Sequence, residues 1–468
     1  MAFNSLVFLA FFAVFYACYL GLYRHAGRRN ALLLAASFCF YGFWDWRFLG
    51  LLWFSTLVDF SVARAMGAQQ DPIRRRRLLL VSIGSNLGVL GLFKYYDFFW
   101  QSLSPFLAAA GLAPQTGLWQ LVLPLGISFY TFQTLGYTID VYRGRIQPAA
   151  NLLHYALYVA FFPQLVAGPI ERAQRLLPQF ARSFRLRGDA VASGLFLVVW
   201  GYFKKLVIAD NLAPLADAGF AQPQQHSGLG LCVAVLAFSL QIYCDFSGYC
   251  DIARGIARLL GFDLGLNFRL PYFAANPREF WRRWHLSLST WLRDYLYIPL
   301  GGDRRGQSRT ALNLMLTMLL GGLWHGAAWH FVWWGAYHGT LLVGHRLYSG
   351  WRRSGPATGW RRWAQCAGMF VCTCIGWVFF RAESLEHALA VLSGLGADAD
   401  PASWQAAGRL LFFAAPLAAI QIWQHRRADL LAPARLSPPW LFCLYAFFLL
   451  GLALFGAREH AGFLYFQF

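Results

Sequence analysis

The sequence contains few charged side chains. Asp, Glu, Lys and Arg make up 13% of its 468 residues, about half of the roughly 25% found in soluble globular domains. Hydrophobic residues make up 58% and occur in long uninterrupted blocks; the segments 7–22, 31–44 and 441–455 carry no charge at all. Because a spanning helix needs about 20 mostly apolar residues, this composition excludes an ordinary soluble protein. It predicts an all-α polytopic membrane protein.

Acidic residues are also scarce, with 21 Asp and Glu against 40 Lys and Arg, which gives a net charge of +19. The basic residues form short clusters between the apolar blocks, at 28–29, 74–77, 282–283, 304–305, 352–353, 361–362 and 426–427. Clusters of this kind are typical of cytoplasmic loops that face anionic headgroups. We therefore expect membrane lipids as partners and no nucleic acid.

The cysteines and histidines lack metal-binding spacing. None of the nine cysteines forms a CxxC pair, and most lie inside apolar segments, which is typical of small buried hydrophobic residues. His325 and His330 are five residues apart with no carboxylate between them, unlike the two histidines of an HExxH helix. We expect no metal site. The first apolar stretch lacks a basic leader and a small-residue cleavage site, so it is expected to be a retained span.

The positive-inside rule predicts ten spanning helices with both termini outside. The predicted spans are 3–23, 31–44, 48–66, 78–93, 118–139, 190–208, 228–246, 363–380, 407–424 and 439–457. The apolar segment 152–170 is interrupted by prolines and a glycine, and we expect it to enter the membrane without crossing. The chain is interpreted as one domain, 1–468, with N-terminal spans (1–120), a core (121–347), C-terminal spans (348–457) and an external tail (458–468).

The segment 311–347 is predicted to be a re-entrant hairpin. Arg309 and Arg346 stand at its two ends, so both ends belong inside. About 14 residues per arm would reach only about 21 Å, which is short of the ~30 Å hydrocarbon core. We therefore expect the glycine-rich tip, 321–326, to lie near the middle of the membrane.

His325 is the strongest catalytic candidate, because it lies in a Trp-His-Gly run at the predicted hairpin tip. Ionisable groups at membrane depth are costly and are functional candidates by default. A neutral imidazole there could accept a proton from an attacking hydroxyl. A core histidine bonded to a carbonyl explains the pattern equally well. For His330, His338 and His345 the sequence favours the structural interpretation.

Aromatic residues alternate with arginines in the segment 279–295, which also contains a His285-x-Ser287 pair. The composition is typical of a helix that lies in the membrane interface. The same arginines could neutralise the phosphates of a bulky acyl carrier that approaches from the cytoplasm. Farther upstream, Asp245 and Asp251 could each pair with an arginine, or one could orient a histidine. Spacing leaves these alternatives open.

Several long motifs resemble the membrane-bound O-acyltransferase (MBOAT) family, in its bacterial alginate O-acetyltransferase branch. They are PLGISFYTFQTLGYTIDVYRG (124–144), FFPQLVAGPIER (161–172), YCDFSGYCDIARGIARLLGF (243–262), PREFWRRWHLSLSTWLRDYLYIPLGG (277–302), GGLWHGAAWHFVWWGAYHG (321–339), GWVFFRAESLEHAL (376–389) and FLYFQF (463–468). The motifs keep the family order, whereas the first 120 residues match in hydropathy only. Two departures from the family pattern, at 268–271 and at His330, do not touch the assignments of the central residues.

The resemblance implies a ring of about ten spanning helices, with re-entrant and interfacial helices, around a thin central region between cytoplasmic and periplasmic funnels. It implies His325 as the catalytic histidine and His285 as its supporting histidine. The donor would be acetyl-CoA, a substrate rather than a permanently bound cofactor. For donor binding we select the following residues: Arg278, Arg282, Arg283, Arg293 and Trp324.

The resemblance also implies a place in the cell. The chain would lie in the bacterial inner membrane, with both termini periplasmic, and pass acetyl groups to an exported polysaccharide such as alginate or cellulose. It would work with a periplasmic or membrane-anchored acetyltransferase and a polysaccharide synthesis and export complex. In related membrane acyltransferases a similar C-terminal motif offers a tyrosine as an acyl shuttle, which points to Tyr465. A purely structural plug is the alternative for this tail.

Three other functions remain open from the sequence. One keeps the family but changes the cargo, to D-alanyl or another acyl group carried to a cell-envelope polymer. The second is a transporter without covalent chemistry, although transporters usually contain structural repeats and none is evident here. The third is a passive scaffold for an export machine, for which His325 would be dispensable.

Overall fold

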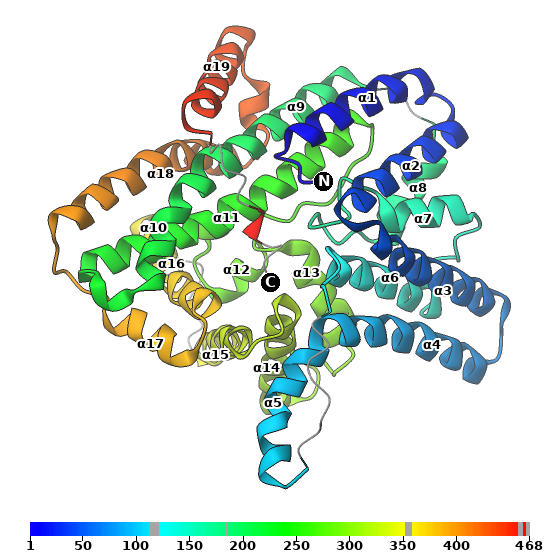
Figure 1. The fold of residues 1–468 in the computed structure, drawn as a ribbon, viewed down its shortest axis with the longest axis horizontal. Coiled ribbons are helices and arrows are strands. Elements are labelled where there is room, and N and C mark those ends of the chain that lie inside the picture. The colour runs from blue at the N-terminus through cyan, green and yellow to red at the C-terminus, as the bar shows by residue number, and fades with distance from the viewer. Residues whose placement is uncertain (113–120, 184–185, 352–357, 457–461, 465–468) are drawn as a thin grey trace. The chain divides into compact units, whose positions relative to one another are not determined.

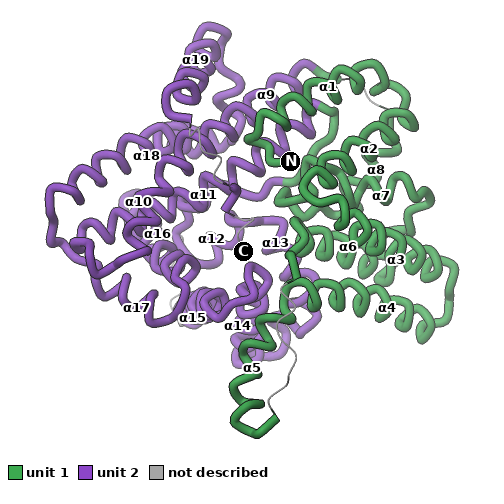
Figure 2. The backbone as a smooth tube through the Cα atoms, in the orientation of Figure 1, with its two compact units in different colours: residues 1–187, 260–265 green, residues 188–259, 266–468 purple. Residues whose placement is uncertain are grey.

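The computed structural model describes residues 1–112, 121–183, 186–351, 358–456 and 462–464. Every regular element in these residues is a helix (Figure 1), which confirms the predicted all-α membrane protein. The chain separates into two compact units (Figure 2). Unit 1 comprises 1–187 and 260–265, and unit 2 comprises 188–259 and 266–468.

Unit 1 holds the N-terminal helices. They are α1 (Leu6–Leu22), α2 (Ala26–Asp45), α3 (Leu49–Ala68), α4 (Pro72–Leu90), α5 (Tyr96–Ala109), α6 (Ile127–Tyr142), α7 (Leu152–Ala160) and α8 (Ala173–Ala181), with a 3₁₀ turn at Trp46–Phe48 and a π-helical turn at Gly91–Tyr95. Helices α3, α4 and α6 pack against one another. Between them the buried carboxylate of Asp59 accepts hydrogen bonds from Ser82 Oγ and Asn86 Nδ2 (2.9 Å for Asn86), so this polar group is satisfied within the apolar bundle.

Unit 2 is built around one long helix, α11 (Gly228–Leu259), of 32 residues and about 48 Å. The other helices are α9 (Gly188–Tyr202), α10 (Asp210–Ala221), α12 (Pro277–Trp281), α13 (Leu286–Leu292), α14 (Gly306–His325), α15 (Trp329–Trp351), α16 (Gly359–Arg381), α17 (Leu385–Ser393), α18 (Pro401–Arg427) and α19 (Pro438–Phe455). Shorter turns lie at Phe203–Ala209 and Arg293–Tyr297 (π-helical) and at Pro223–Gln225, Pro271–Phe273 and Ala432–Arg435 (3₁₀). Helices α9, α10, α16 and α18 all pack on α11.

Seven helical segments of the described chain are long and apolar enough to cross a membrane. They are Ala26–Ala68, Pro72–Ala109, Gly188–Ala221, Gly228–Leu259, Gly359–Arg381, Pro401–Arg427 and Pro438–Phe455. The first contains two of the ten predicted spans, 31–44 and 48–66. Of the remaining predictions, 3–23 corresponds to a 17-residue helix, and 118–139 begins outside the described residues and continues as the 16-residue α6. The segment 152–170 contains only the nine-residue α7, as expected for a non-spanning element.

The predicted segment 311–347 does form two helices that pack against each other, but these arms are longer than expected, and the re-entrant placement stays a prediction. Helix α14 has 20 residues and α15 has 23, which correspond to about 30 and 35 Å. The sequence estimate of 14 residues per arm was too short because the helices continue closer to the turn, to His325 and from Trp329, and also extend past the arginines at their outer ends. Arm length therefore does not place the tip near mid-membrane. The predicted interfacial helix at 279–295 is likewise interrupted, since α12 ends at Trp281 and α13 begins at Leu286.

Candidate active site

His325 is the last residue of α14, and two glycines beside it allow α15 to fold tightly back. A Cβ atom on Gly322 would lie 2.1 Å from the carbonyl oxygen of Phe331, and one on Gly326 would lie 1.9 Å from the ring of Phe331. Real Cβ atoms do not approach backbone or ring atoms so closely. The glycines of the Gly-Leu-Trp-His-Gly run thus fix the turn that presents the imidazole.

Aromatic rings enclose His325. Its side chain is 5% exposed, and its ring centroid lies 5.1 Å from Trp324, 5.0 Å from Trp334 and 5.5 Å from Phe380. Electrostatic interactions are stronger in such a water-poor environment than at a surface. The enclosure suits a group that exchanges a proton with a substrate and must not exchange it with bulk water.

His285 and His325 lie together, although 40 positions separate them in the sequence. Their ring centroids are 6.3 Å apart, and the ring of Trp324 contacts both, at 5.8 and 5.1 Å. Both histidines belong to unit 2. The structure therefore brings three of the sequence-selected residues into one cluster, which we call the histidine centre: His285, Trp324 and His325.

The backbone at His285 is left-handed, with φ of 43°, a conformation that side-chain-bearing residues rarely adopt. Asn267 stabilises it from the neighbouring segment. The carbonyl oxygen of Asn267 accepts a hydrogen bond from the N–H of Leu286 (2.9 Å), and its Oδ1 accepts one from the N–H of Ser287 (3.2 Å). Sequence reasoning missed Asn267, which is fully buried, because the contact joins two segments without regular spacing.

The ring of His285 is fully buried, and its edge meets the ring of Phe246, with centroids 4.8 Å apart. Burial lowers the pKa of His285 from the ordinary 6.5 to about 3. The imidazole is therefore neutral at physiological pH. A neutral ring can accept a hydrogen bond at one nitrogen and donate one from the other, which suits an orienting group rather than a proton carrier.

A basic pocket of about 320 Å³ opens in unit 2. Its lining is Arg269, Leu270, Glu279, Arg282, Arg283, Gln424, His425, Ala428 and Leu430. Two of the four selected arginines, Arg282 and Arg283, belong to it. Of the other two, Arg278 is exposed on α12 and Arg293 pairs with Asp294 at 2.7 Å. The volume lies at the lower end of ligand-binding pockets.

Glu279 organises the charges of this pocket. Its carboxylate pairs with Arg283 at 2.7 Å and with Arg362 at 2.6 Å. Burial acts to raise the pKa of Glu279, but the hydrogen bonds from Arg362, the backbone of Ala275 and Arg283 outweigh it and hold the pKa below its ordinary value. Glu279 is therefore ionised, but Arg269, Arg282 and Arg283 outnumber it in the lining, so the pocket is net positive and complementary to phosphate groups.

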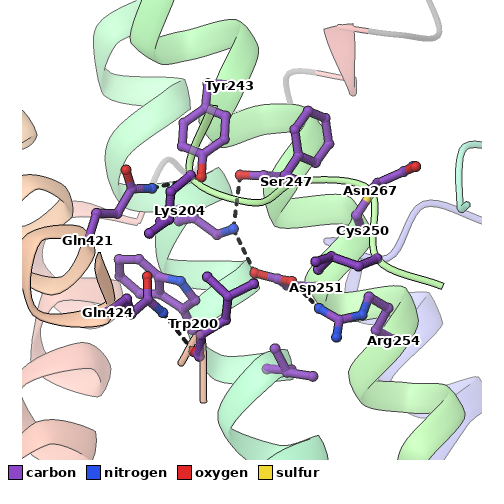
Figure 3. A pocket seen from close by; sticks show the side chains of 15 residues that line it. Trp200, Lys204, Tyr243, Ser247, Cys250, Asp251, Arg254, Asn267, Gln421 and Gln424 are labelled. Carbon is purple, nitrogen blue, oxygen red and sulfur yellow. Dashed lines mark hydrogen bonds and ion pairs between the residues drawn. The ribbon is translucent and has the colours of Figure 1, made fainter. Parts of the chain in front are cut away.

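The acids of α11 pair mainly with two neighbouring lysines that sequence reasoning missed. Lys204 Nζ lies 2.7 Å from Asp251 and 2.9 Å from Ser247 Oγ, and Arg254 pairs with Asp251 at 3.2 Å (Figure 3). Asp251 thus has an arginine partner, whereas the partner of Asp245 is Lys205, at 2.7 Å. The sequence did contain a signal for these two lysines. The Lys-Lys pair interrupts an apolar span at the end that is predicted to lie outside, where the positive-inside rule expects few basic residues.

The cavity around Lys204 is narrow, at about 30 Å³, which is far below the volume of a ligand-binding pocket. We interpret the pairing of Lys204 with Asp251 as part of the packing between α11 and the π-helical turn Phe203–Ala209. All nine cysteines lie in the described residues, where none of them forms a disulfide. Tyr465 lies outside the described residues, which end at Leu464.

Comparison with known proteins gives a consistent picture. The family model for MBOAT, the membrane-bound O-acyltransferase family, matches residues 145–386. A protein of Pseudomonas putida named probable alginate O-acetylase is 42% identical over 412 residues, which cover 86% of this chain and 81% of that protein. Another of that name, from Azotobacter vinelandii, is 44% identical (83% and 76% covered). The peptidoglycan O-acetyltransferase of Helicobacter pylori is 38% identical (84% and 80% covered).

Proposed function

This chain belongs to the membrane-bound O-acyltransferase family and is a multi-pass membrane acyltransferase, and we propose that it passes acetyl groups from cytosolic acetyl-CoA across the bacterial inner membrane for O-acetylation of an exported polysaccharide. The relatives named for alginate and peptidoglycan O-acetylation support a polysaccharide acceptor. The observation that carries the proposal is the pair of histidines, 6.3 Å apart inside an aromatic enclosure.

The chemistry follows from the two imidazoles. A hydroxyl of the acceptor donates a hydrogen bond to a nitrogen of His325, and its oxygen attacks the carbonyl carbon of the thioester as the proton moves to the ring. The C–S bond then breaks, and the thiolate of CoA leaves and takes the proton from the imidazolium. His285, which stays neutral, orients the acceptor or the ring of His325. The acetyl group ends as an ester, and His325 is again neutral.

The basic pocket supports a phosphate-bearing donor. The diphosphate of CoA carries charges that the guanidinium group of Arg282 can bind in a bidentate manner, and Arg283, which is paired with Glu279, adds to the positive charge beside it. Trp324 would contact the acyl end, because its ring lies against both histidines.

Arg282 provides a test of donor binding. We expect Arg282→Gln to raise KM for acetyl-CoA about tenfold, which corresponds to about 1.4 kcal/mol, with kcat nearly unchanged, because a contact to the remote phosphates contributes to ground-state and transition-state binding alike. Arg304→Gln, an exposed arginine in the connection before α14, is the matched control and should leave KM unchanged. Equal KM values for the two variants would remove the pocket from the donor site.

The tail and the partner complete the proposal. Tyr465, which follows Leu464 directly in the sequence, would supply the acceptor hydroxyl: its phenol oxygen would attack the thioester, the thiolate of CoA would leave, and the tyrosine would carry the acetyl group as an ester on the periplasmic side. It would then pass the group to a periplasmic or membrane-anchored acetyltransferase within a polysaccharide synthesis and export complex. Both termini would be periplasmic, as the distribution of basic residues predicts.

The decisive experiment uses membranes that contain the full chain. With acetyl-CoA labelled in the acetyl group we expect label in a polysaccharide or protein ester that hydroxylamine releases, and with acetyl-CoA labelled in the CoA portion we expect none. Membranes without the chain are the control. Failure of acetyl-CoA to label any ester, combined with labelling by an activated D-alanyl donor, would reject acetyl transfer in favour of D-alanyl transfer.

A further inference from the structure

The described part of the tail, residues 462–464, lies against a buried cluster of charges. We call this group of Lys205, Asp210 and Asp245 the tail cluster. The N–H of Leu464 donates a hydrogen bond to Asp245 Oδ2 at 2.9 Å. Lys205 Nζ lies 2.7 Å from Asp245, 2.8 Å from Asp210 and 3.3 Å from the carbonyl oxygen of Gly462. Both lysine and aspartate thus bind backbone atoms of the tail.

The number of hydrogen-bond donors on Lys205 explains why the tail lies against the tail cluster. An ammonium group has three N–H donors and no acceptor, and the two carboxylates and the carbonyl oxygen of Gly462 supply three acceptors. Lys205 is 1% exposed and Asp245 2% exposed, so water does not substitute for these partners. A charge buried to this degree is costly unless its hydrogen bonds are satisfied, and the backbone of the tail completes the set.

Side-chain contacts hold the same segment. Phe463 is 1% exposed; Lys205 Nζ lies 4.8 Å from its ring centroid, and its ring meets that of Tyr249 edge-on, at 4.8 Å and 89°. The end of α19, just before the tail, is held as well, since Asn211 Nδ2 donates to the carbonyl oxygen of Phe455 at 2.8 Å. The chain is thus anchored at both Phe455 and 462–464.

One turn of α11 contacts both the tail and the histidine centre. Asp245 and Tyr249 are four residues apart, so they share a helix face, and both contact the tail. The adjacent residue, Phe246, packs its ring against His285, with centroids 4.8 Å apart. The position of the tail and that of the supporting histidine are therefore fixed by the same five residues, 245–249.

We propose that the tail cluster is a docking site for residues 462–464 of the chain and that this docking is required for acyl transfer at the histidine centre. The docking site rests on the observed contacts of residues 462–464 alone, whereas its role in acyl transfer rests on the proposed function. Lys205, Asp210 and Asp245 are positioning residues in this scheme. They act through the backbone of 462–464 and do not touch the reacting atoms.

The test removes one hydrogen-bond donor from the tail and leaves the buried charges intact. Leu464→Pro lacks the N–H that binds Asp245 and constrains the backbone of the tail, and Leu464→Ala keeps that N–H while shortening the side chain, so the pair separates the backbone contact from the side-chain contact. Full-length protein in detergent is treated with carboxypeptidase, and intact mass is followed. We expect the wild type and Leu464→Ala to resist trimming beyond residue 464. Leu464→Pro should be trimmed past residue 462 at least tenfold faster.

Acetyl transfer is measured on the same samples. We expect Leu464→Pro to fall to the level of a chain lacking its last six residues, while Leu464→Ala stays within about threefold of the wild type. Equal protection of Leu464→Pro and wild-type tails would overturn the docking site. A trimmed Leu464→Pro tail with wild-type transfer would overturn the positioning role. If the wild type transferred no acetyl group, the proposed function would fail, and the trimming rates would still decide the docking site.

Discussion

Replacement of His325 by alanine is expected to reduce acetyl transfer by a factor of about 10² to 10⁴, the usual contribution of a general base. The residue ends α14 and is packed among Trp324, Trp334 and Phe380, so the loss concerns the proton acceptor and not the helix that carries it. Expression, membrane insertion and the elution profile in detergent should match the wild type. The measurement is initial rate of labelled ester formation at saturating acetyl-CoA.

His345 supplies the control for this experiment. It lies in the same hairpin, about 24 Å along α15 from the first residue of that helix, and its ring lies near Ser349. His345→Ala should retain wild-type transfer. Equal losses in both variants would indicate damage to the hairpin, and near-normal transfer by His325→Ala would exclude a catalytic role and favour the scaffold function.

The pH profile separates the two histidines of the centre. Because the pKa of His285 is about 3, its ring does not titrate between pH 5 and pH 8, so any acid limb in that interval belongs to another group. His285→Gln should therefore lower the rate while leaving the midpoint of that limb in place. A midpoint that disappears with His285 would reverse the two assignments.

The second large effect is expected at Gly322. A methyl group there would lie 2.1 Å from the carbonyl oxygen of Phe331, so α14 and α15 must separate by more than 1 Å. Misplacement of a catalytic group by about 1 Å can cost about 10²-fold in rate, and overpacking costs roughly 1–3 kcal/mol in stability. We expect Gly322→Ala to lose transfer about a hundredfold and to unfold at a lower temperature.

Gly321, the preceding residue, is the matched control. Its Cβ would meet only the Cδ1 atom of Leu292, at 3.1 Å, and the end of a leucine side chain can move. Alanine also favours a helix over glycine by roughly 0.5–1 kcal/mol. Gly321→Ala should therefore keep both transfer and thermal stability near wild type. If the two adjacent variants behaved alike, the tight approach of the hairpin arms would not be what positions His325.

Hydropathy alone sufficed to predict the membrane class and most of the long helices, because lipid requires every backbone group to be paired within a helix. It failed where helices continue past polar ends. Arg309 was taken as the end of an apolar arm, yet α14 begins at Gly306. A guanidinium group at a helix end reaches polar surroundings without ending the helix. A charged residue therefore indicates where the chain leaves the apolar part of the membrane, and it does not indicate where the helix ends.

The candidate site could be predicted only where a motif carried it. The run around His325 and the His285-x-Ser287 pair were recognisable, and the structure brings both histidines together. The contacts of Asn267 with Ser287 and of Lys205 with Asp245 could not be predicted, because the two residues of each pair lie 20 or more positions apart. Such contacts have no period in the sequence, and they arise only when helices have packed.

The left-handed backbone of His285 has a consequence for how the enzyme is made. A non-glycine residue in this conformation costs roughly 1–2 kcal/mol, and the hydrogen bonds from the adjacent residues to Asn267 offset that cost. In a nascent chain whose helices have all entered the bilayer, the segments that contain Asn267 and His285 would not yet be in contact. The hydrogen bonds that fix the ring of His285 would then be missing. Translocon-mediated insertion would thus yield an inert protein, and catalytic competence would appear only at the last step of maturation.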